Sequence, residues 1–131
     1  MRLDDLTILI VEDEPIIALV LEDKLLDRGA NPVLAHSFDS AAELIGRQAL
    51  DLAILDVNIH GQQSYPLAQM LRDKGTPCIF VTGYGGALHP EAFAHVTTLT
   101  KPYSVAALDD ALQTALAFRN ASQPEPDAPL T

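Results

Sequence analysis

The chain has 131 residues, which is enough for one domain with a hydrophobic core, and 48% of its residues are apolar. A formal net charge of -10, with only 8 Lys and Arg residues, argues against direct nucleic-acid binding, because that needs a basic surface. The single cysteine, Cys78, excludes an internal disulfide and a cysteine-based zinc site, and no apolar run is long enough for a membrane helix, so we expect a cytoplasmic protein.

Short apolar runs alternate with amphipathic helical patterns along the whole chain. The apolar runs predict strands at residues 7–11, 32–35, 52–56, 78–82 and 96–100. The helical patterns predict helices at residues 15–28, 37–45, 65–74 and 105–119. Two of these helices carry the expected end signals. Pro15 stands in the first turn of the helix at residues 15–28 and Gly29 follows its last turn, while Gly75 follows the helix at residues 65–74.

Repeated strand–helix units imply a doubly wound α/β fold. We expect a five-stranded parallel sheet in the flavodoxin-like order 2-1-3-4-5, with helices on both faces. The segment before the last strand is rich in glycine and contains Pro90, which predicts a short or mobile fourth helix. The domain is expected to span residues 1–120, and the acidic, proline-rich residues 121–131 are expected to be a disordered tail.

Polar residues stand where the predicted strands end. Glu12 and Asp13 follow the first strand, Asp56 ends the third, and Lys101 ends the fifth. Neighbouring carboxylates repel, which raises the proton affinity of at least one of them unless a cation compensates. Carboxylates together with a backbone carbonyl, which Asn58 could supply, are the ligands that Mg²⁺ prefers.

Each of these residues also has an ordinary structural interpretation. Asp13 could cap the following helix, Asp56 could be a turn acid, and Thr82 is a common strand residue. His60, next to a glycine, is predicted to be a plain loop residue. The functional interpretation depends on the conjunction, because every candidate falls at the carboxyl end of its strand, where ligands bind in open α/β sheets.

At these residues the sequence resembles the receiver domain of two-component response regulators, the family to which CheY belongs. The resemblance covers residues 7 to about 119 and is carried by the motifs VEDEP, LAILDVN, IFVTG and LTKPY. It implies that Asp56 accepts a phosphoryl group. It also implies a Mg²⁺ or Mn²⁺ ion bound by Asp13, by Glu12 mostly through water, by Asp56 and by the carbonyl of Asn58.

The same resemblance assigns roles to the ends of the last two strands. Thr82 would bind a phosphoryl oxygen through its hydroxyl, and Lys101 would pair with the phosphate. Gly83 and Pro102, which follow them, would complete the phosphate-binding site. The protein would catalyse only its own phosphorylation and autodephosphorylation, and so would not be an enzyme acting on other substrates.

A narrower resemblance is to the FATGUY subgroup of receivers, through the sequence FVTGY of residues 80–84. Such receivers pair with sensor histidine kinases of the HWE or HisKA_2 type. Many receivers have an aromatic residue three positions before the lysine, but here that position is Thr98, so the usual Thr–Tyr switch is in doubt. The residues predicted to move instead are Tyr84, Gly85, Gly86 and Thr98.

The expected function is that of a stand-alone response regulator, because no second domain follows the last helix in the sequence. It would signal by contact with a downstream protein or phosphotransfer partner, or would act as a phosphate sink, without binding DNA or membranes. An alternative is a small Mg²⁺-dependent phosphatase-like enzyme, but Asn58 stands where its general acid would be. A flavodoxin-like cofactor binder is disfavoured because the acids after the first strand would repel a phosphate.

Overall fold

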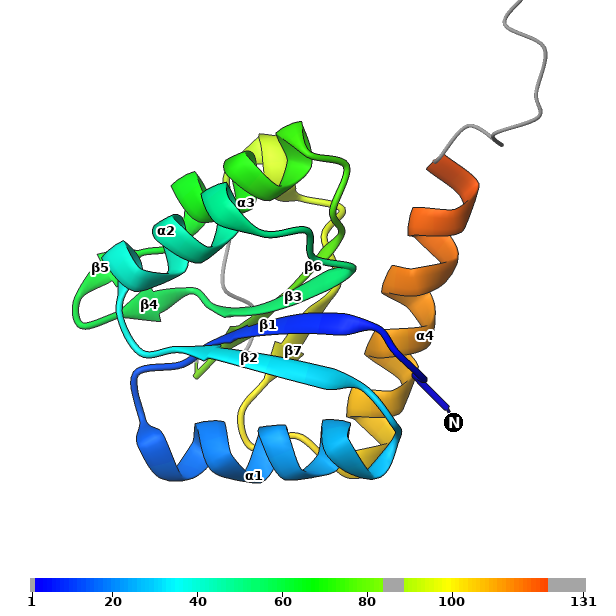
Figure 1. Ribbon diagram of the computed structural model, residues 1–131. Helices are drawn as coiled ribbons and strands as arrows, with labels where there is room; N and C mark the ends of the chain where they lie inside the picture. The colour runs from blue at the N-terminus through cyan, green and yellow to red at the C-terminus, as the bar shows by residue number, and fades with distance from the viewer. Residues whose placement is uncertain (1, 84–88, 123–131) are drawn as a thin grey trace, which may run out of the picture.

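The structure is a computed structural model that describes residues 2–83 and 89–122, with side chains described as far as residue 117. Five parallel strands form a sheet in the order β2-β1-β3-β6-β7 (Figure 1). These strands are β1 (Thr7–Val11), β2 (Asn31–Ala35), β3 (Leu52–Asp56), β6 (Cys78–Thr82) and β7 (Thr98–Thr100). With β6 and β7 counted as the fourth and fifth strands, the predicted order 2-1-3-4-5 is confirmed.

Helices cover both faces of the sheet, as the nearly continuous apolar strands require. They are α1 (Pro15–Asp27), α2 (Phe38–Arg47), α3 (Tyr65–Asp73) and α4 (Val105–Ser122). Successive strand residues point to opposite faces, so Leu52 and Ile54 pack in the core beneath α1 and α4. Ala53 and Leu55 pack in the core beneath α2 and α3. None of the helices within the described residues is both long and apolar enough to cross a membrane.

The helices α2 and α3 both begin after a serine, but only one serine acts as a cap. The Ser37 hydroxyl accepts a hydrogen bond from the Ser40 amide at 3.1 Å. Ser64 precedes α3 without making a side-chain cap, and its buried Oγ has no hydrogen-bond partner among the residues that the structure describes.

We expect Ser37→Ala to lower the free energy of unfolding by about 1 kcal/mol, because it leaves a helix amide unsatisfied. Ser64→Ala should leave that free energy unchanged or raise it, because it removes a buried hydroxyl that has no partner. Urea unfolding followed by circular dichroism measures both variants. An equal loss in the two would contradict this assignment of the caps.

The segment between β6 and β7 contains no full helix within its described residues. It holds the short 3₁₀ helix η1 (Glu91–Phe93), which fits the predicted short fourth helix. The last strand begins at Thr98 rather than at residue 96, because the Val96 amide bonds back to the Phe93 carbonyl in a turn. The predicted switch residues at positions 84, 85 and 86, and residues 123–131 of the predicted tail, lie outside the described residues.

A small hairpin after β3 was not predicted from the sequence. It pairs β4 (Asn58–Ile59) with β5 (Gln62–Gln63) in antiparallel fashion. His60 and Gly61 form its turn with φ values of 49° and 81°. Positive φ at both central residues is typical of the two-residue turns whose twist matches a hairpin. The hairpin therefore fixes the chain that leaves Asp56.

Candidate functional site

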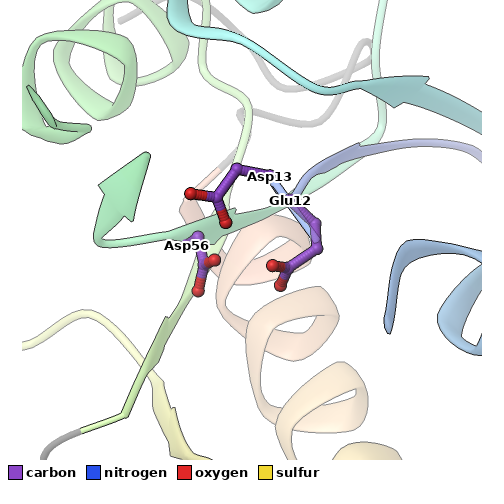
Figure 2. A group of neighbouring side chains, drawn as sticks. All are labelled: Glu12, Asp13 and Asp56. Carbon is purple, nitrogen blue, oxygen red and sulfur yellow. The ribbon is translucent and has the colours of Figure 1, made fainter. Parts of the chain in front are cut away.

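Three carboxylates meet at the carboxyl end of the sheet. β1 and β3 are neighbours, with Val11 opposite Leu55, so the residues that follow β1 lie beside the end of β3. Glu12, Asp13 and Asp56 each place a carboxylate oxygen within 4.8 Å of the others. Figure 2 shows the three side chains turned towards a common space. Glu12 and Asp56 are buried, whereas Asp13 is partly exposed, so two charges lie in a poorly solvated environment.

Lys101 compensates part of this negative charge. It follows β7, and its ammonium lies 3.0 Å from Glu12 Oε2 and 3.1 Å from Asp56 Oδ1. The Glu14 carboxylate lies farther away, at 3.9 Å. The lysine side chain is 20% exposed, so its interactions with the two buried acids are only weakly screened by water. One cation thus faces several acids, which leaves the cluster negative.

This arrangement raises the pKa of Asp56 to about 7. Burial is the largest cause, and the neighbouring Glu12 carboxylate adds to it, while the Lys101 ammonium opposes both. Partial burial alone would lower the pKa of Lys101, but its hydrogen bonds to Glu12 and Asp56 hold that pKa above its ordinary value. The lysine therefore stays charged at neutral pH, while Asp56 is poised to gain or lose a proton.

Asp13 is held differently from the other two acids. Burial by itself would raise the pKa of Asp13, but the backbone amide of His60 donates a hydrogen bond to it at 2.9 Å and the net effect is a lowered pKa. The His60 ring bonds in turn to the carbonyl of His36 at 3.1 Å. The tip of the hairpin thus fixes Asp13 in its charged form. His60 was predicted to be a plain loop residue, and its place before Gly61, a pair that suits a hairpin turn, was its only sequence signal.

Two of the three carboxylates, those of Asp13 and Asp56, line a pocket of about 590 Å³. The predicted residues that line it are Asp13, Asp56, Asn58, Thr82, Gly83 and Lys101. Glu12 and Pro102 do not line the pocket: Glu12 is paired with Lys101, and Pro102 follows that lysine in the chain. The pocket is also lined by Tyr65, which was not predicted because its position depends on how α3 packs.

The predicted switch residue Thr98 lies away from the pocket. It is exposed at the start of β7, and its Oγ1 lies 2.8 Å from His89 Nε2. His89 in turn contacts the hydroxyl of Tyr65 at 2.8 Å. His89 was not singled out from the sequence, because a lone histidine in a loop carries no signal until the fold brings its partners together.

The donor set fits a hard divalent cation such as Mg²⁺. Such ions bind oxygen ligands from one or two carboxylates, keep several waters and commonly bind a phosphoryl oxygen. Three carboxylates within 4.8 Å of one another match this requirement, and Asn58 lies on the same pocket. A cation there would also offset the burial and the repulsion from Glu12 that together raise the pKa of Asp56.

We expect Asp13→Asn to weaken Mg²⁺ binding at least about tenfold, because it removes the carboxylate that stays charged and partly exposed. Isothermal titration with MgCl₂ measures the affinity. Asp23→Asn is the matched control, because it makes the same change of charge on an exposed residue of α1. Equal affinities of the Asp13 variant and the parent would show that Asp13 is not a ligand.

Comparison with known proteins agrees with this geometry. A sequence model of the response regulator receiver domain matches residues 8–113. The response regulator PilR of Pseudomonas aeruginosa is 32% identical over 120 residues, which is 86% of this chain and 26% of PilR. This chain therefore spans about a quarter of that curated relative.

Solved structures of other proteins are also similar to this chain. The solution structure of SdrG from Sphingomonas melonis is 35% identical, with a TM-score of 0.76 over 86% of this chain and 97% of that one. TrrA of Thermotoga maritima, solved in complex with Mg²⁺ and BeF, has a TM-score of 0.75 over 85% of this chain and 99% of that one. At 24% identity, the TrrA structure supports the fold alone.

Proposed function

Because this chain belongs to the response regulator receiver family, we propose that Asp56 accepts a phosphoryl group from a sensor histidine kinase. The observation that carries the proposal is the conjunction at one edge of the sheet. A buried carboxylate whose pKa is raised to about 7 lies beside a lysine ammonium and opens into a pocket large enough for a phosphoryl group. Nucleophile and cation come from strands far apart in the sequence.

The chemistry is a displacement at phosphorus. A carboxylate oxygen of Asp56 attacks the phosphoryl group of a phosphohistidine, the P–N bond breaks, and an aspartyl phosphate forms. The transition state spreads charge over the equatorial oxygens, so catalysis comes mostly from positioning and electrostatics. Lys101 would pair with one of these oxygens, and the Thr82 hydroxyl and the chain at Gly83, which line the same pocket, would meet others.

A divalent cation, Mg²⁺ or Mn²⁺, would supply positive charge that screens the acids and the incoming phosphoryl group. Asp13, Asp56 and the carbonyl of Asn58 would hold it directly, with Glu12 acting mostly through water. Before the donor arrives, Lys101 is hydrogen-bonded to Glu12 and Asp56 and compensates part of their negative charge.

The output is proposed to be contact with another protein or withdrawal of phosphate from a shared kinase, by a stand-alone regulator. The only reactions catalysed would be phosphorylation and dephosphorylation of Asp56 itself. The motif of residues 80–84 supports membership of the FATGUY subgroup and a kinase partner of the HWE or HisKA_2 type. The acidic character of the chain supports an output that does not involve DNA.

Incubation with acetyl phosphate, with and without Mg²⁺, followed by intact-mass measurement, tests the proposal. We expect one phosphate adduct that requires Mg²⁺ and is absent from Asp56→Ala. Asp51→Ala serves as a control, because Asp51 stands just before β3 at the opposite end of the strand. An adduct that survives Asp56→Ala would disprove the assignment of the phosphoacceptor.

A further inference from the structure

His89 lies between the pocket and the exposed strand β7. Its Nδ1 is 2.8 Å from the hydroxyl of Tyr65, which lines the pocket. Its Nε2 is 2.8 Å from Oγ1 of Thr98, which is exposed at the start of β7. One imidazole therefore joins a pocket residue to a surface residue, although the two lie on different elements of the fold.

One assignment of the His89 tautomer satisfies every hydrogen bond of this group. Thr98 donates to the Val96 carbonyl at 3.1 Å, so we assign its oxygen as the acceptor from Nε2–H of His89. A neutral imidazole has one donor and one acceptor, so in this tautomer Nδ1 accepts a hydrogen bond from the Tyr65 hydroxyl. Partial burial lowers the pKa of His89, which agrees with this neutral form. The bonds form a chain, called here the Tyr65–His89–Thr98 chain, in which every group is satisfied.

Aromatic packing holds the same residues together. Phe80 is buried on β6, and the centroid of its ring lies 5.4 Å from that of Tyr65 and 4.8 Å from that of His89. Phe93 of η1 stacks on Tyr65 with centroids 5.6 Å apart. A shift of the Tyr65 ring away from the pocket therefore moves it against Phe80, His89 or Phe93, because these rings already contact it.

The sheet places this packed group directly next to the predicted phosphate contacts. Phe80 pairs with Thr98 in the β6–β7 register and stands two residues before Thr82. Residues two apart on a strand point to the same face, so Phe80 and Thr82 share the α3 side of the sheet. Tyr65 touches both regions, since it lines the pocket and packs on Phe80.

We propose that the Tyr65–His89–Thr98 chain transmits phosphorylation of Asp56 to the surface of β7. This inference rests on the proposed function, because it names how the same site is coupled to an output. A phosphoryl group adds about two negative charges beside Tyr65, which changes both the packing of that ring and the competition for its proton. Displacement of Tyr65 removes both the donor to Nδ1 and a ring that packs against His89, so the imidazole turns and its bond to Thr98 is lost. The exposed start of β7 then presents a different surface to a partner.

NMR of the parent and of variants tests the proposal, with Mg²⁺ and beryllofluoride as the probe of the phosphorylated state. His89→Phe keeps a ring against Phe80 but removes both hydrogen bonds. Thr98→Val keeps a β-branched side chain on an exposed strand position and removes the acceptor. Thr100→Val is the matched control, because Thr100 is also exposed on β7 but lies outside the chain.

In the parent and in Thr100→Val, beryllofluoride should shift the amide signals of Asp56 and Thr82 and those of residues 96–98. In His89→Phe and Thr98→Val, the signals of Asp56 and Thr82 should still shift, while the response of residues 96–98 is lost. An unchanged response of residues 96–98 in Thr98→Val, or in a folded His89→Phe, would overturn the inference and leave the proposed function standing. Absence of any shift at Asp56 in the parent would count against the proposed function itself.

Discussion

Replacing Lys101 with methionine lowers the free energy of unfolding by about 2–3 kcal/mol at pH 8 in the absence of Mg²⁺. Lys101 is the cation between the buried carboxylates of Glu12 and Asp56, at 3.0 and 3.1 Å. Its removal leaves both acids buried without compensation. The expected cost lies below that of breaking a fully buried ion pair because the lysine side chain is 20% exposed. Urea unfolding followed by circular dichroism measures the change.

The same variant should take up phosphate from acetyl phosphate at least about 100-fold more slowly, because it lacks a positive charge directed at the transferred group. Lys24→Met, which removes an equal charge from α1, is the control for both measurements. The double variant Lys101→Met/Asp56→Asn should regain most of the stability that Lys101→Met loses. Asp56→Asn removes the repulsion between Glu12 and Asp56 that the lysine had compensated. If Lys101→Met and Lys24→Met behaved alike, Lys101 would have no special role in the cluster.

Asp56→Asn is expected to raise the free energy of unfolding by about 1–3 kcal/mol at pH 8 without Mg²⁺. The pKa of Asp56 is about 7 in the folded protein, against an ordinary value of 3.8. The folded state therefore binds a proton more tightly than the unfolded state. The stability from this proton is fully present below about pH 4 and is lost as the pH rises through about 7. Asparagine carries no such charge and avoids this loss.

Unfolding in urea at pH 5.5 and pH 8 separates this effect from others. The parent should lose more stability between these pH values than Asp56→Asn does, because the other titrating groups are common to both. Asp23→Asn, which changes an exposed acid of α1, controls for the loss of a carboxylate elsewhere in the protein. Mg²⁺ should stabilise the parent more than Asp56→Asn, since it relieves the same repulsion. Parallel pH profiles for the two proteins would contradict the raised pKa.

The sequence predicted the sheet order and the meeting of Glu12, Asp13 and Asp56 for one physical reason. Strands that are apolar on both faces favour a parallel sheet covered by helices, and the carboxyl ends of parallel strands meet at one edge. The polar residues at the ends of these strands were therefore expected to lie together at that edge. Lys101 could be placed at the same edge by the same argument, although its position between Glu12 and Asp56 required the structure.

Features that depend on contacts between elements were not predicted. The hairpin after β3 consists of two-residue strands with exposed glutamines, so it has no hydrophobic pattern, and only the turn at His60–Gly61 carries a signal. His89 stands in a loop, and its role depends on Tyr65 from α3 and Thr98 from β7 meeting there. The sequence indicated that Thr98 lacks the usual aromatic ring but could not indicate what lies beside it.

The most direct test of the central proposal identifies the phosphorylated residue chemically. After reaction with acetyl phosphate and Mg²⁺, borohydride reduces an aspartyl phosphate to homoserine, and peptide sequencing by mass spectrometry locates it. We predict homoserine at position 56, within the peptide that contains β3, and no reduced residue at position 12 or 13. Homoserine at position 13, the five-carbon alcohol that a glutamyl phosphate gives at position 12, or an unchanged Asp56 in protein that has taken up phosphate would contradict the assignment of Asp56 as the phosphoryl acceptor.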